Sequence, residues 1–151
     1  MPTFFELVTP RCVVFLKGAT KDEVLREMVG VLDALGALDD EERFRKAIFD
    51  REALMTTALG IGIAVPHERV PPDMPFALAV GLHTEGIDFG ALDGQPVQVV
   101  VMIAQPAGAT EEYLQILSQV ATFLKNPANF NAILGAADED EVVEIIRRAS
   151  L

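Results

Sequence analysis

A histidine at the end of an apolar, glycine-containing segment is the residue best placed to do chemistry. His67 directly follows Pro66 in the run Gly60-Ile-Gly-Ile-Ala-Val-Pro-His67. Proline fixes φ and cannot donate a ladder hydrogen bond, so we expect a short buried strand to end there with the imidazole at its exit. An imidazole beside glycines that expose backbone N–H groups can act as a nucleophile or a base. The alternative is that His67 only caps the strand and faces solvent.

Other familiar kinds of site are not supported by the sequence. Gly60-Ile-Gly62 lacks the third glycine of a dinucleotide fingerprint, and no GxxxxGK[ST] loop or GxSxG serine elbow occurs. A zinc site needs several convergent ligands, whereas Cys12, His67 and His83 show no close paired spacing. We therefore expect neither a cofactor nor a metal ion.

The apolar pattern changes along the chain in a way that predicts the fold. Residues 13–16 read as a short strand, and the central apolar segments read as strands buried on both faces. Those central segments are residues 60–66, 76–82 and 97–104. Spacings of three and four predict helices before them, over about residues 20–36 and 39–54, and again through the last third. We predict one α/β domain over residues 1–151, a three-layer α/β/α sandwich with a central mixed sheet of about five strands.

Composition excludes several classes of partner. The chain has 151 residues, with 12 Lys plus Arg against 23 Asp plus Glu, and its net charge is -11. This acid excess argues against nucleic acid and against anionic membrane surfaces. The apolar segments are too short to span a bilayer, so no membrane insertion is expected. A lone cysteine, Cys12, and the lack of a secretory signal lead us to expect a cytoplasmic protein.

Two separated motifs carry a resemblance to a known family. Arg51-Glu-Ala-Leu-Met-Thr-Thr57, followed by the glycines and His67, resembles the phosphorylation-site segment of enzyme IIA domains of the mannitol/fructose type. These domains belong to the phosphoenolpyruvate-dependent sugar phosphotransferase system, and the form is closest to the stand-alone nitrogen-regulatory IIA proteins. The second motif, Ile87-Asp-Phe-x-x-Leu-Asp-Gly-x-Pro-Val97 with the later Tyr113-Leu-x-x-Leu117, looks like the second half of the same family.

The resemblance implies phosphotransfer. His67 would accept a phosphoryl group from an HPr-type phosphocarrier, and would pass it to a IIB domain or use its phosphorylation state to regulate other proteins. Arg51 would donate two hydrogen bonds from its guanidinium to the phosphoryl oxygens. The alternative is that Arg51 only forms an exposed salt bridge at a helix end. Thr57, Gly60 and Gly62 would add hydroxyl and backbone donors around the anion. Because no IIB, IIC or transporter sequence is attached, we expect a mainly regulatory role.

Three residues complicate this interpretation. Tyr113 stands where the family usually has a second histidine, and its neutral hydroxyl could bind a phosphoryl oxygen but supplies neither a proton relay nor a cation. Glu68 stands where many members have glycine, and its charge would oppose phosphohistidine by about 1 kcal/mol. His83 is interpreted as structural, with a substitute role for the second histidine as the alternative. The competing functions are a non-catalytic interaction module and, more remotely, a domain that shares only the fold, like the cytosolic domains of some anion transporters.

Overall fold

Strand β6 (Val97–Pro106) is the centre of a six-stranded mixed sheet in the computed structural model, which describes residues 2–150. On one side β6 pairs antiparallel with β5 (Ala77–Ile87), and β5 pairs parallel with β1 (Val13–Phe15). On the other side β3 (Ile63–Ala64) and β4 (His67–Val70) run parallel to β6. Strand β2 (Ala58–Gly60) completes the sheet antiparallel to β3. The predicted mixed central sheet is confirmed.

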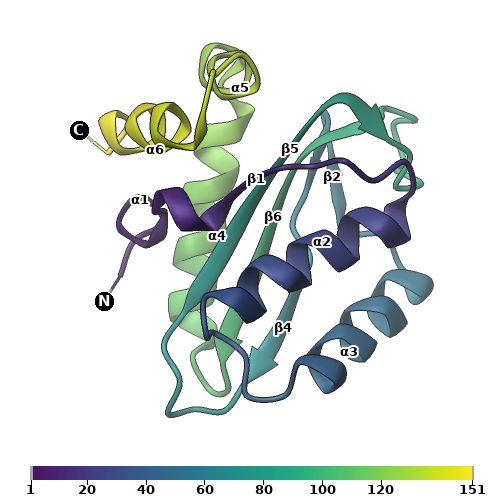
Figure 1. Ribbon diagram of the computed structural model, residues 1–151, viewed down its shortest axis with the longest axis vertical. Helices are drawn as coiled ribbons and strands as arrows, with labels where there is room; N and C mark the ends of the chain where they lie inside the picture. The colour runs from purple at the N-terminus through teal and green to yellow at the C-terminus, as the bar shows by residue number, and fades with distance from the viewer. Residues whose placement is uncertain (1, 151) are drawn as a thin grey trace.

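Helices cover both faces of this sheet (Figure 1). Helices α2 (Lys21–Ala34) and α3 (Glu41–Leu54) pack on one face. The other face carries α1 (Phe4–Leu7), α4 (Thr110–Lys125), α5 (Pro127–Leu134) and α6 (Glu139–Arg148), and a short 3-10 turn, η1 (Pro10–Cys12), lies between α1 and β1. The three-layer α/β/α architecture is therefore confirmed for the described residues; residues 1 and 151 of the predicted domain lie outside them.

Two hydrophobic cores meet at the sheet, and strand β6 contributes to both. Val99, Val101 and Ile103 belong to the core under α4, whereas Val100 and Met102 belong to the core under α2 and α3. Successive side chains of a strand point to opposite faces, so an apolar run without alternation places apolar groups in both cores. This explains why residues 97–104 read as a strand buried on both faces.

The predicted helix ends follow capping chemistry. The Thr20 side chain caps α2 by accepting a hydrogen bond from the Glu23 N–H, and its hydroxyl lies 3.1 Å from Glu23 Oε1. Gly36, just beyond α2, has φ 72° and donates its N–H to the Asp33 carbonyl, which ends the helix. Asp40 caps α3 by accepting from the Arg43 N–H.

The segment 60–66 is not the single strand that its apolar run predicted. Strands β2 and β3 form a hairpin whose turn residues, Ile61 and Gly62, have φ 52° and 83°, as a type I′ turn requires. Pro66 does not interrupt the pairing with β6, because its carbonyl accepts a hydrogen bond from Ile103 N. The N–H group that proline lacks is not needed for pairing with β6. His67 therefore begins strand β4 and does not end a strand.

Gly81 of β5 sets how closely α2 approaches the sheet. A Cβ placed there would lie 2.5 Å from the Met28 sulfur and 2.9 Å from Leu16 Cδ1. We expect Gly81→Ala to lower the free energy of unfolding by about 1–3 kcal/mol through overpacking, measured by urea denaturation. Gly30→Ala, in an exposed position of α2 with no atom nearby, should raise it by about 0.5–1 kcal/mol. A Gly81→Ala variant as stable as the wild type would contradict this packing argument.

Candidate functional site

His67 is half-buried, and the contact that Nδ1 makes determines which ring nitrogen carries the proton. Its Nδ1 lies 3.4 Å from the Val65 carbonyl oxygen, which can only accept a hydrogen bond. The Nδ1 atom therefore carries the proton, and Nε2 keeps a free lone pair. Backbone pairing of His67 with Ile103 of β6 fixes the position from which the ring projects.

Arg51, in the last turn of α3, faces that lone pair. Its Nη1 lies 3.0 Å from His67 Nε2, and a guanidinium only donates, so the contact agrees with a lone pair on Nε2. Its other terminal nitrogen, Nη2, lies 3.8 Å from Glu68 Oε1. The structure thus brings Arg51 and His67 together, and the alternative of a helix-end salt bridge describes only part of what Arg51 contacts.

Burial is the main cause that lowers the pKa of the His67 imidazole below its usual value of 6.5. The positive charges of Arg51 and Arg69 act in the same direction, while the Val65 carbonyl and the Glu68 carboxylate raise it. The ring is therefore neutral near pH 7, with a nucleophilic nitrogen facing a cation.

Tyr113 packs against the imidazole from the first turn of α4. The two ring centroids are 4.7 Å apart with an angle of 32° between the planes, and Tyr113 is 8% exposed. Burial raises the pKa of its phenol, against a smaller opposite effect of Arg51, so the hydroxyl stays protonated near pH 7. The helix start has no side-chain cap, because Ala109 is the N-cap residue. The structure thus brings Tyr113, the residue at the position of the second family histidine, against His67.

Thr57 supports the site through its neighbours. Its hydroxyl and its N–H both donate to Glu52 Oε1, so the hydroxyl is engaged away from the imidazole. The Glu52 carboxylate is 3% exposed and forms an ion pair with Lys21, with 2.5 Å between Nζ and Oε2. The Thr57 carbonyl accepts from Val65 N, which lies two residues before His67.

Gly60 and Gly62 lie at the other end of the sheet. The Gly62 carbonyl accepts from Gln98 N and Val99 N of β6, whereas His67 pairs with Ile103. At the rise of a strand this register difference is roughly 16 Å. A Cβ at Gly60 would lie 3.1 Å from the Asp93 carboxylate. The expectation that these glycines surround a phosphoryl group on His67 is therefore not met, because the hairpin turn carries them away.

His83 is also distant from His67 along the sheet, since Leu82 beside it pairs with Val99. Its Nδ1 accepts from Gly86 N at 2.9 Å, and its Nε2 lies 3.0 Å from the Gly18 carbonyl. The Nδ1 contact lies within β5, and the Nε2 contact joins this end of β5 to the loop before α2. This geometry agrees with a structural histidine and leaves the substitute role without a basis.

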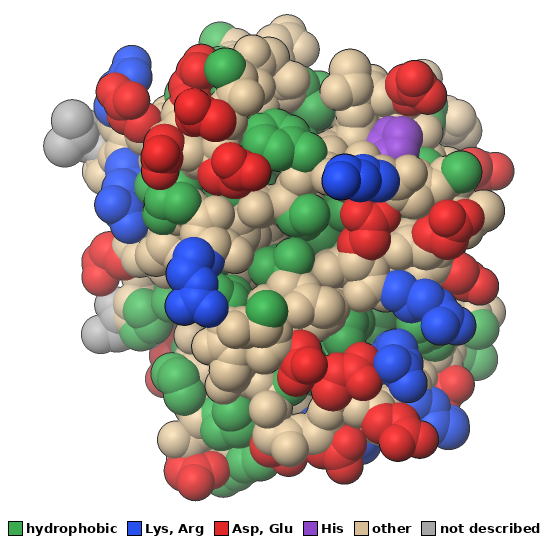
Figure 2. Space-filling model, viewed as in Figure 1, with side chains coloured by type: hydrophobic (Ala, Val, Ile, Leu, Met, Phe, Trp, Pro, Cys, Tyr) green, Lys and Arg blue, Asp and Glu red, His purple; other side chains and the backbone are tan. Residues whose placement is uncertain are grey.

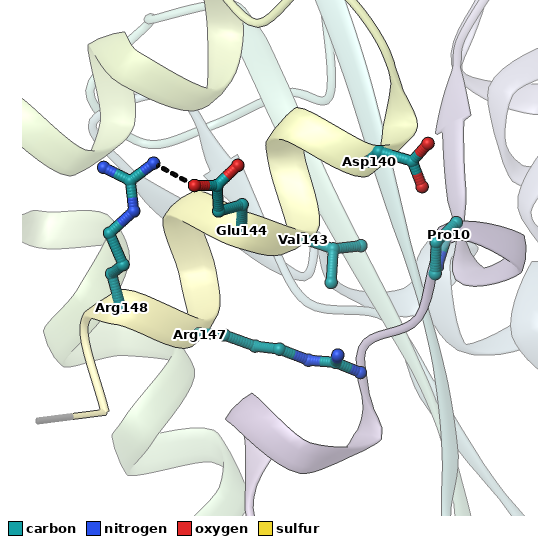
Figure 3. A pocket seen from close by; sticks show the side chains of 6 residues that line it. All are labelled: Pro10, Asp140, Val143, Glu144, Arg147 and Arg148. Atoms are coloured by element: carbon teal, nitrogen blue, oxygen red, sulfur yellow. Dashed lines mark hydrogen bonds and ion pairs between the residues drawn. The ribbon is translucent and has the colours of Figure 1, made fainter.

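The remaining surface offers other features, away from this group. A hollow of about 490 Å³ lies between η1 and α6 and is lined by residues that include Pro10, Arg147 and Arg148, with Arg148 paired to Glu144 at 2.6 Å (Figure 3). Acidic side chains are spread across the face seen in Figure 2 and are interrupted by Lys and Arg.

Within residues 2–150 no helix has the length and hydropathy needed to cross a bilayer. Over the same range no three His, Cys, Asp or Glu side chains gather as a metal site would require.

Comparison with known proteins identifies the family. Residues 6–149 match the family model for the phosphoenolpyruvate-dependent sugar phosphotransferase system, EIIA 2. The chain is 36% identical to the PTS system fructose-specific EIIABC component of Bacillus subtilis (strain 168), over 95% of this chain but only 23% of that longer protein. It is 30% identical to the PTS system fructose-specific EIIA component of Haloferax volcanii, over 95% of each chain.

A solved structure agrees with these sequence matches. The crystal structure of nitrogen regulatory protein IIA-Ntr from Neisseria meningitidis has a TM-score of 0.85 and 25% identity, covering 94% of this chain and 97% of that one. The fold and the family match therefore point to the same group of proteins. The chain belongs to the mannitol/fructose-type EIIA family of the phosphoenolpyruvate-dependent sugar phosphotransferase system.

Proposed function

We propose that His67 accepts a phosphoryl group on Nε2 from an HPr-type phosphocarrier protein. The observation that carries this proposal is the neutral imidazole whose Nδ1 proton faces the Val65 carbonyl, so that the Nε2 lone pair faces Arg51 at 3.0 Å. In the transfer, the bond from phosphorus to the carrier breaks as the bond from Nε2 to phosphorus forms. The carrier keeps the electron pair of the bond that breaks.

Arg51 is the group that stabilises the transferred phosphoryl. Its guanidinium has N–H donors arranged in a fork that suits phosphoryl oxygens, and its side chain is 46% exposed and so accessible to an incoming partner. Phosphoryl transfer needs little more than positioning and charge stabilisation. When the phosphoryl group takes the Nε2 lone pair, the Arg51 N–H groups are released to the oxygens.

Tyr113 is compatible with this reaction. Nε2 carries no proton before attack, so the transfer needs no general base. The Tyr113 ring holds the plane of the imidazole by packing against it. It adds no positive charge, so the anion is stabilised less than it would be beside a second histidine.

The surface beside the site offers apolar contacts to a partner. Leu54 ends the helix turn that carries Arg51, Met55 is its C-cap residue, and Leu114 follows Tyr113 in α4. The Leu54, Met55 and Leu114 side chains are 88%, 76% and 55% exposed. Large exposed apolar side chains next to a functional group are typical of a docking rim. The net charge of -11 would steer a partner with a basic face toward this protein.

The use of the phosphoryl group is proposed to be mainly regulatory, with phosphorylation of His67 changing how other proteins bind. The likeness to a nitrogen regulatory IIA-Ntr structure supports this, and the fructose-specific relatives favour transfer to a IIB domain instead. A non-catalytic interaction module is the second candidate, and Tyr113 in place of a second histidine is the observation that favours it.

Phosphotransfer can be tested with the purified components. Incubation with phosphoenolpyruvate, enzyme I and an HPr-type carrier should add one acid-labile phosphate to the protein. The addition is measured by intact-mass spectrometry. His67→Ala should take up none, because it lacks the acceptor nitrogen, whereas His83→Ala should still be labelled. Wild-type protein without acid-labile phosphate would refute the proposal and leave the interaction module in its place.

The lowered pKa of His67 predicts a pH dependence of stability. At a pH just below 6.5 the unfolded chain binds a proton that the folded imidazole does not, so stability is lost as the pH falls from 6.5 toward the folded pKa. Urea unfolding across this window should show a smaller loss in His67→Gln than in the wild type. An equal loss in both proteins would contradict the assigned state of the ring.

Restoring the second histidine should speed the transfer. Tyr113→His places an imidazole beside the phosphoryl site that can donate to its oxygens, and we expect a rate about ten-fold higher in rapid-quench labelling. Tyr113→Phe keeps the packed ring without the hydroxyl and should stay near the wild-type rate. An unchanged or slower rate in Tyr113→His would show that the second histidine is not what limits turnover.

A further inference from the structure

Glu68 contacts the same guanidinium that faces the phosphoacceptor nitrogen. Its Oε1 lies 3.8 Å from Arg51 Nη2, while Arg51 Nη1 lies 3.0 Å from His67 Nε2. The Glu68 side chain is only 14% exposed, and its Oε1 accepts from the Arg69 N–H at 2.7 Å. The carboxylate is therefore held in place on one side of Arg51 and is not a free surface charge.

We propose that Glu68 is a positioning residue that shares Arg51 with His67 and thereby weakens the hold of the site on its phosphoryl group. This inference rests on the proposed function. It gives Glu68 a role in the transfer equilibrium, so that the phosphoryl group is passed on and not retained.

The argument follows from the number of partners that one guanidinium can serve. A phosphoryl group on Nε2 would draw the N–H groups of Arg51 to its oxygens. If Arg51 then moves away from Glu68, the ion pair between them is lost. If Arg51 stays paired with Glu68, the Glu68 carboxylate remains close to the new anion. Both outcomes make the phosphorylated state less favourable, and low exposure of Glu68 reduces the screening by salt.

The surrounding charges do not relieve this competition. Arg51, Glu68 and Arg69 are the charged side chains that act on the His67 ring. The sequence has no Lys or Arg between Arg69 and Lys125, so β5, β6 and the start of α4 bring no second cation. The first turn of α4 adds the acids Glu111 and Glu112. Arg51 is consequently the main cation available to both anions.

The test measures how the phosphoryl group distributes between carrier and acceptor. Wild type and Glu68→Gln are mixed with known amounts of phosphorylated HPr-type carrier, and the ratio at equilibrium is read by intact mass. The amide oxygen of the substituted side chain can still accept from the Arg69 N–H, so the change removes charge while keeping shape. We expect the equilibrium to move about five-fold toward the phosphorylated acceptor. Glu85→Gln, an exposed acid at the far end of β5, is matched in charge and should leave the ratio unchanged.

A second readout does not require phosphate and would not respond to a merely structural role. In an NMR titration the pKa of His67 should fall in Glu68→Gln, because the carboxylate raises it, and should stay constant in Glu85→Gln. If wild type is labelled but Glu68→Gln shows the same equilibrium and the same His67 pKa, the inference alone is overturned. If wild type accepts no phosphoryl group from the carrier, the proposed function fails and the inference fails with it. A shift of equal size in Glu85→Gln would reduce the effect to net charge and would also overturn it.

Discussion

The hydrogen bond between Arg51 Nη1 and His67 Nε2 is the interaction on which the site depends. It joins the end of α3 to the start of β4, and it requires that both ends be held within hydrogen-bond distance. His67 is held by the register of β4 against β6, and its ring is oriented by the Val65 carbonyl on one nitrogen and the packed Tyr113 ring on its face. The Val65 and Tyr113 contacts leave Nε2 unprotonated, so its lone pair faces Arg51, and a nucleophile in this position needs such a lone pair.

The end of α3 is held by a buried ion pair. Lys21 begins α2 and pairs with Glu52, the residue after Arg51, and Glu52 in turn accepts from Thr57. Removing one partner of a buried pair leaves an uncompensated charge, so such a pair constrains geometry more surely than it adds stability. Because the Thr57 carbonyl accepts from Val65 N, one continuous set of contacts runs from the start of α2 to Val65, the residue whose carbonyl orients the His67 ring.

Sequence patterns predicted the parts of this structure that depend on local chemistry, such as the helix over about residues 20–36 and the two-faced burial of residues 97–104. The hairpin at Ile61 was hidden because a β-branched residue with positive φ rarely occupies a turn, and missing it also misplaced the two glycines beside it. His67 could be chosen as the candidate phosphoacceptor from the sequence because it is a histidine within a recognisable motif. Lys21 and Glu52 were missed because their pairing is purely tertiary: nothing in either local sequence indicates that these two helices bring a lysine to a carboxylate.

The balance of charge at this site suits passing on a phosphoryl group better than retaining one. A site that retains a phosphoryl group would surround it with cations, whereas here one arginine is shared between the nucleophile and a fixed carboxylate, in a chain of net charge -11. The neutral imidazole allows attack without a base, and the tyrosine adds packing without charge. Weak retention lowers the barrier for the group to leave, because destabilising the phosphorylated ground state without equally destabilising the transition state speeds the onward step. Under the proposed function, the features that would make the anion harder to hold would therefore suit reversible phosphorylation of His67.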